Sequence, residues 1–443
     1  MYKRKKKQLK KMLINHNKKF VKHIIERYAS FSNTKFVKHI IERYAPFSTV
    51  NIQTKLAQAG CKKTDDNNNN NNTDLTPPIH FSTTFEREKD LSYLSHIYSR
   101  TSNPTRDLLE ETIADLENGT DCCSFASGSA ATSSLLTAVG NNSHVIIGND
   151  VYHGTRSLLE NVFNNWGLFH TEIDLTDMDI IKNEVETIKT QGKNVILISE
   201  IPTNPSLNVP DLIEISNLLR NYENCIHICD STWMSPAICN PLNLGVDMVL
   251  HSTTKYMGGH SDLLGGCIAY NKQGNDTNKY SQQVFDQIRI VQQQSGNVPS
   301  PFDSWLLLRG LRSLDARIAR HCENAFKIAE YLENHNAIYK INYPGLVSHP
   351  QHDIMSKMIS NNNRYGGMLS IELKGGMEKA IDVSSKVQIF KRATSLGGTE
   401  SLIEHRKSIE PENSPTPDSL LRLSIGLENV DDLIKDLDHA LRS

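Results

Sequence analysis

The sequence predicts an α/β fold built on a mostly parallel sheet with helices on both faces, and three observations indicate it. Short apolar runs alternate with stretches of helical periodicity from about residue 105 onward. A small polar or glycine-bearing segment follows each apolar run. The 443 residues, 38% hydrophobic and 22% charged, suffice for two or three domains and a large core.

The expected elements follow one another in the order of alternating strands and helices. They are a helix over 105–117, strands over 144–148 and 194–199, a helix over 210–221, and strands over 225–229 and 247–251. A further strand is expected around Leu421–Gly426. In open parallel sheets, ligands bind at the carboxyl ends of the strands. The segments that follow the strands are therefore the place to look for a site.

Several classes of protein are disfavoured by the composition. No run of about 18 apolar residues occurs, so a membrane-spanning helix is not expected. The eight cysteines lie in apolar segments without a CxxC pair, which favours buried thiols in a cytoplasmic protein over a zinc site or disulfides. The cysteines are Cys61, Cys122, Cys123, Cys225, Cys229, Cys239, Cys267 and Cys322.

The net charge of −2 conceals a basic N-terminal arm on an acidic body. Residues 1–63 hold 17 Lys and Arg against two Glu. The arm repeats one sequence twice, at Lys19–Ala29 and Lys35–Ala45, with apolar residues on one helical face. A solvated tail, a mitochondrial presequence, and a nucleic-acid or membrane patch all remain open for it. Asn67–Asn72, inside a polar stretch over 65–74, predicts a disordered loop.

Two segments after strands carry groups suited to an anionic, ring-bearing ligand. Ser127-Gly128-Ser129 precedes a helix, where a phosphate can meet free N–H groups, although small residues there can also be simple caps. Asp230 ends an apolar strand and can pair with a protonated ring nitrogen or cap a helix.

Lys255 follows the last strand of this series. Partial burial there would lower its pKa and suit it to amine chemistry, whereas most loop lysines are solvated. Ser252 and Thr254 flank it and can bind a phosphate. Tyr152 can stack on a flat ring or pack in the core, and Arg422 can bind a carboxylate or form a surface salt bridge.

Together these segments resemble the Cys/Met-metabolism family of fold-type I pyridoxal-phosphate (PLP) enzymes over residues 54–441. The stretch from Pro241 to Asp262 is similar to the family's cofactor-lysine signature over its full length. The family contains cystathionine lyases, cystathionine γ-synthases and homoserine sulfhydrylases. The resemblance implies a PLP-binding domain over 106–300 and a smaller C-terminal α/β domain over 301–443. It also implies a segment over 53–105 that contacts a neighbouring subunit, after a basic extension over 1–52 that is disordered or helical.

The resemblance also implies roles for individual residues. Lys255 would hold the cofactor as a Schiff base and shuttle protons, Asp230 would pair with the pyridine nitrogen, and Tyr152 would stack on the ring. Asn204 would contact the phenolic oxygen, and Arg422 with Ser395 would bind the substrate carboxylate. The phosphate would be held by Gly128, Ser129, Ser252 and Thr254, and, from the neighbouring subunit, by Tyr98 and Arg100.

The resemblance implies a homo-oligomer, a dimer or a dimer of dimers, that acts on a small amino-acid substrate and needs no metal, nucleic acid or membrane. Cystathionine carbon–sulfur cleavage by β- or γ-elimination is the leading hypothesis. Cystathionine γ-synthesis or O-acylhomoserine sulfhydrylation is the runner-up, and an inactive scaffold whose basic arm binds nucleic acid or membrane is the alternative of another class.

The sequence departs from the family pattern at several places. Ser129 replaces a common methionine, His153 a glycine, and Ser231 and Trp233 the usual Asn and Phe. The segment over 404–418 is shortened and lacks the family's Met-Thr-His run near the substrate pocket. This segment therefore bears on the choice of substrate.

Overall fold

The computed structural model describes residues 50–61, 74–93, 95–272, 279–360, 363–410 and 414–442. The chain divides into two units, Met1–Lys55 and Leu56–Ser443. The tandem repeat and the Asn67–Asn72 run lie outside the described residues, so the predictions for them stay predictions.

A seven-stranded sheet forms the larger part of the second unit, with strand order β1-β7-β6-β5-β4-β2-β3. Only β7 runs against its neighbours β6 and β1, while β6, β5, β4, β2 and β3 pair in parallel. The strands are β1 (Asp121–Phe125), β2 (Ser143–Gly148), β3 (Phe169–Ile173), β4 (Asn194–Glu200), β5 (Cys225–Asp230), β6 (Met248–His251) and β7 (Gly266–Tyr270). The predicted mostly parallel sheet is confirmed.

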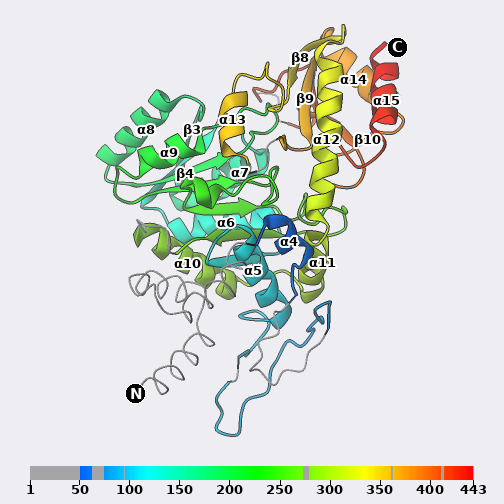
Figure 1. The fold of residues 1–443 in the computed structure, drawn as a ribbon. Coiled ribbons are helices and arrows are strands. Elements are labelled where there is room, and N and C mark those ends of the chain that lie inside the picture. Colours follow the sequence, from blue (N-terminus) through cyan, green and yellow to red (C-terminus); the bar gives the residue numbers. More distant parts are fainter. Residues whose placement is uncertain are drawn as a thin grey trace, which may run out of the picture. The chain divides into compact units, whose positions relative to one another are not determined.

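Helices cover both faces of this sheet because its central strands are apolar on both sides. Ile196 and Ile198 of β4 belong to the core that α6 (Gly128–Val139) and α10 (Lys279–Ser295) cover. Val195 and Leu197, which alternate with them, face the core beneath α8 (Met178–Thr190) and α9 (Leu212–Leu219). Figure 1 shows these two helical layers on opposite sides of the sheet.

The C-terminal part contains a smaller, five-stranded sheet of order β10-β11-β12-β9-β8. Its strands are β8 (Ile338–Asn342), β9 (Met368–Leu373), β10 (Lys391–Arg392), β11 (Leu402–His405) and β12 (Leu420–Ser424). The helices α12 (Leu314–Glu333), α14 (Gly376–Lys386) and α15 (Val430–Arg442) pack with it around a separate apolar core. The predicted smaller C-terminal α/β part is confirmed.

The long helix α12 connects the two sheets (Figure 1). Near its start, the Arg317 guanidinium donates to the carbonyl oxygens of Tyr256 and Gly310, both at 2.7 Å. One turn later, His321 Nδ1 lies 2.6 Å from the carbonyl oxygen of Ile425, just after β12. These contacts fix the C-terminal sheet against the segment that follows β6.

Capping residues decide where the predicted helices begin. The helix expected over 105–117 is α5 (Pro104–Leu116), because the Asn103 side chain accepts the N–H groups of Thr105 and Arg106. The helix expected over 210–221 is shorter, because Asp211 accepts from Ile213 and Glu214 and so starts α9 at Leu212. The remaining helices are α4 (Ile52–Ala57), α7 (His153–Leu158), α11 (Pro301–Leu311) and α13 (His352–Met358), and the short turns are η3 (Leu159–Phe163), η4 (Asn164–Trp166), η5 (Pro241–Leu244) and η6 (Arg406–Ile409).

Seven of the eight cysteines are buried, and none forms a disulfide, as expected from their apolar surroundings. Within the described ranges, no helix combines the length and apolar character needed to cross a membrane.

A buried ion pair fixes the end of β6 next to the segment that carries Lys255. His251 Nε2 lies 2.7 Å from Glu117 Oε1, and both side chains are almost wholly inaccessible to solvent. Burial alone would lower the pKa of His251, but the charge and hydrogen bond of Glu117 outweigh it and raise the pKa to about 9.

Unfolding measured against pH tests this pair. The pKa of His251 is higher in the folded than in the unfolded chain, so its stabilisation is complete below about pH 6.5 and lost as the pH rises through about 9. The difference amounts to about 3 kcal/mol. We expect Glu117→Gln to remove this pH dependence of the urea midpoint, whereas Glu323→Gln, at an exposed ion pair, keeps it. Identical profiles for Glu117→Gln and the wild type would contradict the assignment.

Candidate active site

A cavity of about 500 Å³ lies where β4, β5 and β6 end and α6 begins. Ten of the twelve residues singled out from the sequence line it, which confirms that the polar segments after the strands converge. They are Gly128, Ser129, Tyr152, Asn204, Asp230, Ser252, Thr254, Lys255, Ser395 and Arg422.

Lys255 follows β6 in a turn that its backbone N–H closes on the carbonyl oxygen of Ser252. Its Nζ donates to Ser395 Oγ at 2.7 Å. Burial lowers the pKa of Lys255 to about 8, with a further lowering by Arg422 and an opposing effect of Glu404. About one tenth of the amine is therefore uncharged at pH 7, far more than for an ordinary lysine with a pKa of about 10.4, and the uncharged form is the nucleophile.

Asp230 ends β5 with one carboxylate oxygen held in place. Its Oδ1 accepts the backbone N–H of Thr232 at 3.0 Å and the Thr232 hydroxyl at 2.5 Å. Burial raises the pKa of Asp230, while the hydrogen bonds from Thr232 oppose the rise. Within the described part of the chain, Oδ2 has no hydrogen-bond partner, so it can serve a protonated ring nitrogen.

The start of α6 forms a narrow cradle against Ser252. The Ser127 hydroxyl oxygen accepts the N–H of Ala130 at 3.0 Å, so this serine caps the helix. A Cβ added to Gly128 would lie 2.8 Å from Ser252 Cβ, a distance that only glycine avoids. The helix dipole and the free N–H groups at this end favour an anion, and the hydroxyls of Ser252 and Thr254 face the same cavity.

Tyr152 is half exposed at the cavity wall, and its backbone N–H donates to Glu200 Oε2 at 2.7 Å. Glu200 ends β4 beside Asp230, its register partner on β5. Burial, followed by the charge of Asp230, raises the pKa of Glu200 well above its ordinary value. Sequence reasoning assigned no role to Glu200, although its place directly after an apolar strand was a usable signal.

Arg422 lies in β12, buried, with its guanidinium held on three sides. Nη1 donates to Asn204 Oδ1 at 3.0 Å, Nη2 donates to the carbonyl oxygen of Ser395 at 3.3 Å, and Nη2 lies 2.5 Å from Glu404 Oε2. Ser395 has a positive φ of 84°, a conformation that costs a non-glycine residue about 1–3 kcal/mol. Such strain is typical of residues that function constrains, and here it turns both Ser395 oxygens toward Arg422 and Lys255.

Tyr98 and Arg100 do not line the cavity of their own chain. Tyr98 is 45% exposed, and Arg100 lies over its ring while Nη1 donates to the Gln293 carbonyl oxygen at 2.5 Å. Their predicted role in the neighbouring subunit's site therefore stays a prediction.

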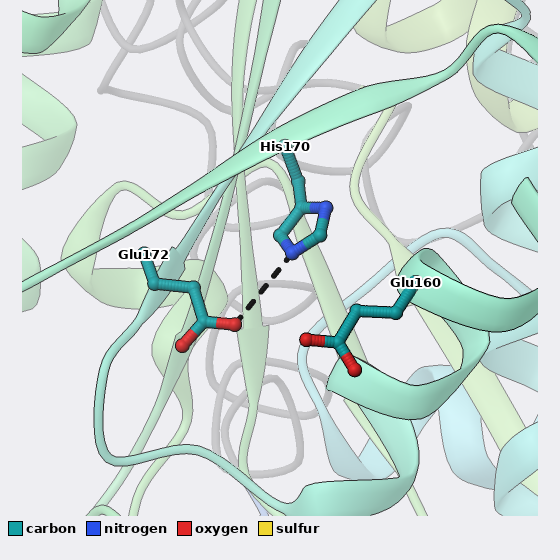
Figure 2. Close-up of side chains that lie close together, drawn as sticks. All are labelled: Glu160, His170 and Glu172. Atoms are coloured by element: carbon teal, nitrogen blue, oxygen red, sulfur yellow. Dashed lines mark ion pairs between the residues drawn. The ribbon is translucent and has the colours of Figure 1, made fainter. Parts of the chain in front are cut away.

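A second group of side chains that could bind a metal ion, Glu160, His170 and Glu172, is not among the residues that line the cavity. One ligand atom each from Glu160, His170 and Glu172 lie within 4.8 Å of one another, and Glu160 and Glu172 are exposed. Figure 2 shows the three side chains converging from η3 and β3. Arg156 already neutralises Glu172 through two contacts from Nε, at 2.8 and 2.9 Å.

Comparison with known proteins identifies relatives over almost the whole chain. Residues 53–442 match the family model described as Cys/Met metabolism PLP-dependent enzyme. A cystathionine beta-lyase of Coxiella burnetii is 38% identical, covering 88% of this chain and 98% of that protein. A cystathionine gamma-synthase of Mycobacterium tuberculosis is also 38% identical, covering 82% and 91%. The crystal structure of a cystathionine gamma-lyase from Lactobacillus plantarum complexed with L-serine superposes with a TM-score of 0.80 at 33% identity, covering 89% and 99%.

The amine of Lys255 can be titrated by chemical modification of the cofactor-free protein. We expect the acetylation rate of Lys255, followed by peptide mass spectrometry, to rise with a midpoint near pH 8, because burial and Arg422 disfavour its charged form. Exposed lysines in the same digest, with an ordinary pKa of about 10.4, serve as the reference. Glu404→Gln should move the midpoint lower, since Glu404 raises this pKa. A midpoint equal to that of exposed lysines would refute the assignment.

Proposed function

Because the chain belongs to the Cys/Met metabolism PLP-dependent enzyme family, we propose that it cleaves the carbon–sulfur bond of cystathionine. Its cofactor is PLP and its substrate an amino acid. The observation that carries the proposal is the Lys255 amine with a lowered pKa, hydrogen-bonded to Ser395 in the cavity that also holds Arg422.

The cavity residues fit the chemical groups of PLP. The cradle at Gly128 and Ser129, with Ser252 and Thr254, suits the phosphate, and the unpartnered Oδ2 of Asp230 suits the ring nitrogen. Asn204 and Tyr152 would hold the phenolic oxygen and the ring face, and Asn204 Nδ2 stays available because its Oδ1 accepts from Arg422. When bound, PLP supplies a sink for the electron pair left on the substrate's α-carbon.

The chain's own residues orient the substrate and move its protons. Arg422 binds the α-carboxylate, since a guanidinium grips a carboxylate with two parallel hydrogen bonds. Lys255 Nζ would take the α-proton, since burial and Arg422 lower its pKa to about 8 and so raise the share of free amine near neutral pH. Asp230, held through Oδ1 by Thr232, would keep the ring nitrogen of PLP protonated. The carbon–sulfur bond would then break with its electron pair on sulfur, and Lys255 would return a proton to the departing thiolate.

Product analysis of the purified holoenzyme tests the reaction. With cystathionine alone we expect a thiol, a 2-oxo acid and ammonia, with homocysteine marking β-cleavage and cysteine marking γ-cleavage. Lys255→Ala should lower kcat by roughly 10²–10⁴-fold, because it removes the proton-transfer group. Lys407→Gln, outside the cavity lining, is the matched control. Turnover of O-acylhomoserine with cysteine, without cleavage of cystathionine, would instead identify a γ-replacement enzyme.

The same proposal includes a dimer with active sites shared between subunits. Residues 74–93 and 95–103 form an extended segment that projects from the sheets (Figure 1). It exposes Leu75, Phe81, Leu91 and Ile97, and such an exposed apolar surface favours a protein interface. Tyr98 and Arg100 lie on this segment, as expected for groups that serve the neighbouring cavity.

Mixing two inactive variants tests the shared site. Arg100→Ala and Lys255→Ala each lose activity in every homodimer, but a mixed dimer contains one site with both residues intact. After subunit exchange we expect about a quarter of wild-type activity to return. Arg156→Ala, at an ion pair outside the neighbour-facing segment, should be active without mixing. No recovery in dimers shown to be mixed would argue that each site is built from one chain.

A further inference from the structure

Arg406 is a second arginine in the cavity wall, in η6 directly after β11. It is 5% exposed and lines the cavity together with Arg422, Ser395 and Lys255. It belongs to the segment over 404–418, which departs from the family pattern. A buried guanidinium at a ligand cavity is costly unless paired, so its partners decide what it can do.

Four charged side chains of alternating sign run along this wall. Glu404 Oε2 lies 2.5 Å from Arg422 Nη2 and 3.1 Å from Arg406 Nη1, so one carboxylate oxygen serves both arginines. Glu410 Oε1 accepts from Arg406 Nε at 3.0 Å and from Nη2 at 2.6 Å. The sharing of Glu404 places the two guanidinium groups close together at the cavity.

Glu410 has no acceptor position left for a ligand. Its Oε1 takes the two donors of Arg406, and its Oε2 accepts the hydroxyls of Ser414 at 2.6 Å and Thr416 at 2.5 Å. A carboxylate offers about four such positions. Glu410 lines the cavity, but its contacts assign it to holding Arg406.

Arg406, by contrast, has N–H donors that its partners do not use. Its contacts use three of the five guanidinium N–H groups, and the other two have no partner in the part of the chain that the structure describes. Burial alone would lower the pKa of Arg406, but the charges of Glu404 and Glu410 raise it, so the group stays a cation. Its planar fork suits a carboxylate.

We propose that Arg406 binds a second carboxylate at the far end of the substrate side chain, while Arg422 binds the α-carboxylate. The favoured substrates are then amino acids with two carboxylates, a class that includes cystathionine and O-succinylhomoserine but not methionine or O-acetylhomoserine. The assignment of the reacting end to Arg422 rests on the proposed function. Two carboxylates on neighbouring arginines require a ligand chain that bends or is short.

Binding of unreactive acids to the holoenzyme tests the subsite without turnover. The probes are glutarate, adipate and pimelate, each compared by calorimetry with the monocarboxylate of the same chain length. None carries an amine, so none reacts with the cofactor. A charge-assisted hydrogen-bond pair should make the best dicarboxylate bind roughly ten- to a hundredfold more tightly than its partner. Equal affinities across the whole wild-type series would overturn the proposal.

Variants of Arg406 test whether this residue causes the difference in affinity between dicarboxylates and monocarboxylates. Arg406→Gln should reduce this ratio to about one, and Arg406→Lys, which keeps the charge but loses the fork, should give an intermediate ratio. Lys407→Gln is the matched control, because it removes a neighbouring cation whose Nζ donates to the Ser414 carbonyl oxygen and which does not line the cavity. A ratio that survives in Arg406→Gln would assign the second carboxylate to another group and overturn the proposal.

Steady-state kinetics distinguish direct binding of the substrate by Arg406 from an effect of Arg406 on the position of Arg422. If Arg406 contacts the substrate, Arg406→Gln raises KM for O-succinylhomoserine roughly tenfold or more and leaves O-acetylhomoserine almost unchanged. Equal losses on both esters would show that Arg406 acts only through Glu404 and Arg422. Failure of cystathionine cleavage alone would overturn the proposed function and leave the binding ratio intact.

Discussion

Both faces of the seven-stranded sheet are covered by helices, and this constraint decides where polar side chains can lie. Inside the sheet, alternate residues of β4 enter opposite apolar cores, so an ionisable group on either face must stay neutral or find a partner, as His227 of β5 does between Ser199 and Ser216. The carboxyl ends of the strands are where the backbone leaves this apolar surrounding. Glu200, Asp230 and the segment from Ser252 to Lys255 occupy these ends and meet at one cavity.

Burial gives the charged groups at this edge their chemical character. Glu117 matches the buried His251 with a charge, and Glu404 does the same for Arg422. Lys255 has no carboxylate partner of its own in the described ranges; Nζ meets only the Ser395 hydroxyl, and its pKa falls to about 8. The pKa values of the paired His251 and Arg422, about 9 and about 10, keep both groups charged at neutral pH, whereas burial brings the pKa of Lys255 closest to neutrality. The charged groups that have partners therefore position other residues, whereas Lys255 is the group that can react.

The sequence was sufficient to predict the groups that follow strands directly. Asp230 and Lys255 could be found because a break in an apolar run is visible in one segment. Glu404 could not be assigned, because its pairing with Arg422 arises from the register of β11 and β12. The Arg406–Glu410 pair is local, but nothing in the sequence shows that both residues line a cavity. The start of α9 was misplaced by two residues, because the cap is the aspartate after the proline. The roles predicted for Tyr98 and Arg100 involve a second subunit and stay predictions.

Two sets of groups line the cavity, and they come from different sheets. The groups suited to PLP come from the large sheet and α6, whereas Ser395, Arg406 and Arg422 come from the C-terminal sheet and its connections. Changes in the segment after β11 can therefore alter which side chain is accepted without moving Lys255 or Asp230. Relatives named for lyase and synthase reactions share this fold at similar identity. The proposal that Arg406 binds a second carboxylate places the choice of substrate in the charged residues around Arg422, outside the groups that fit PLP.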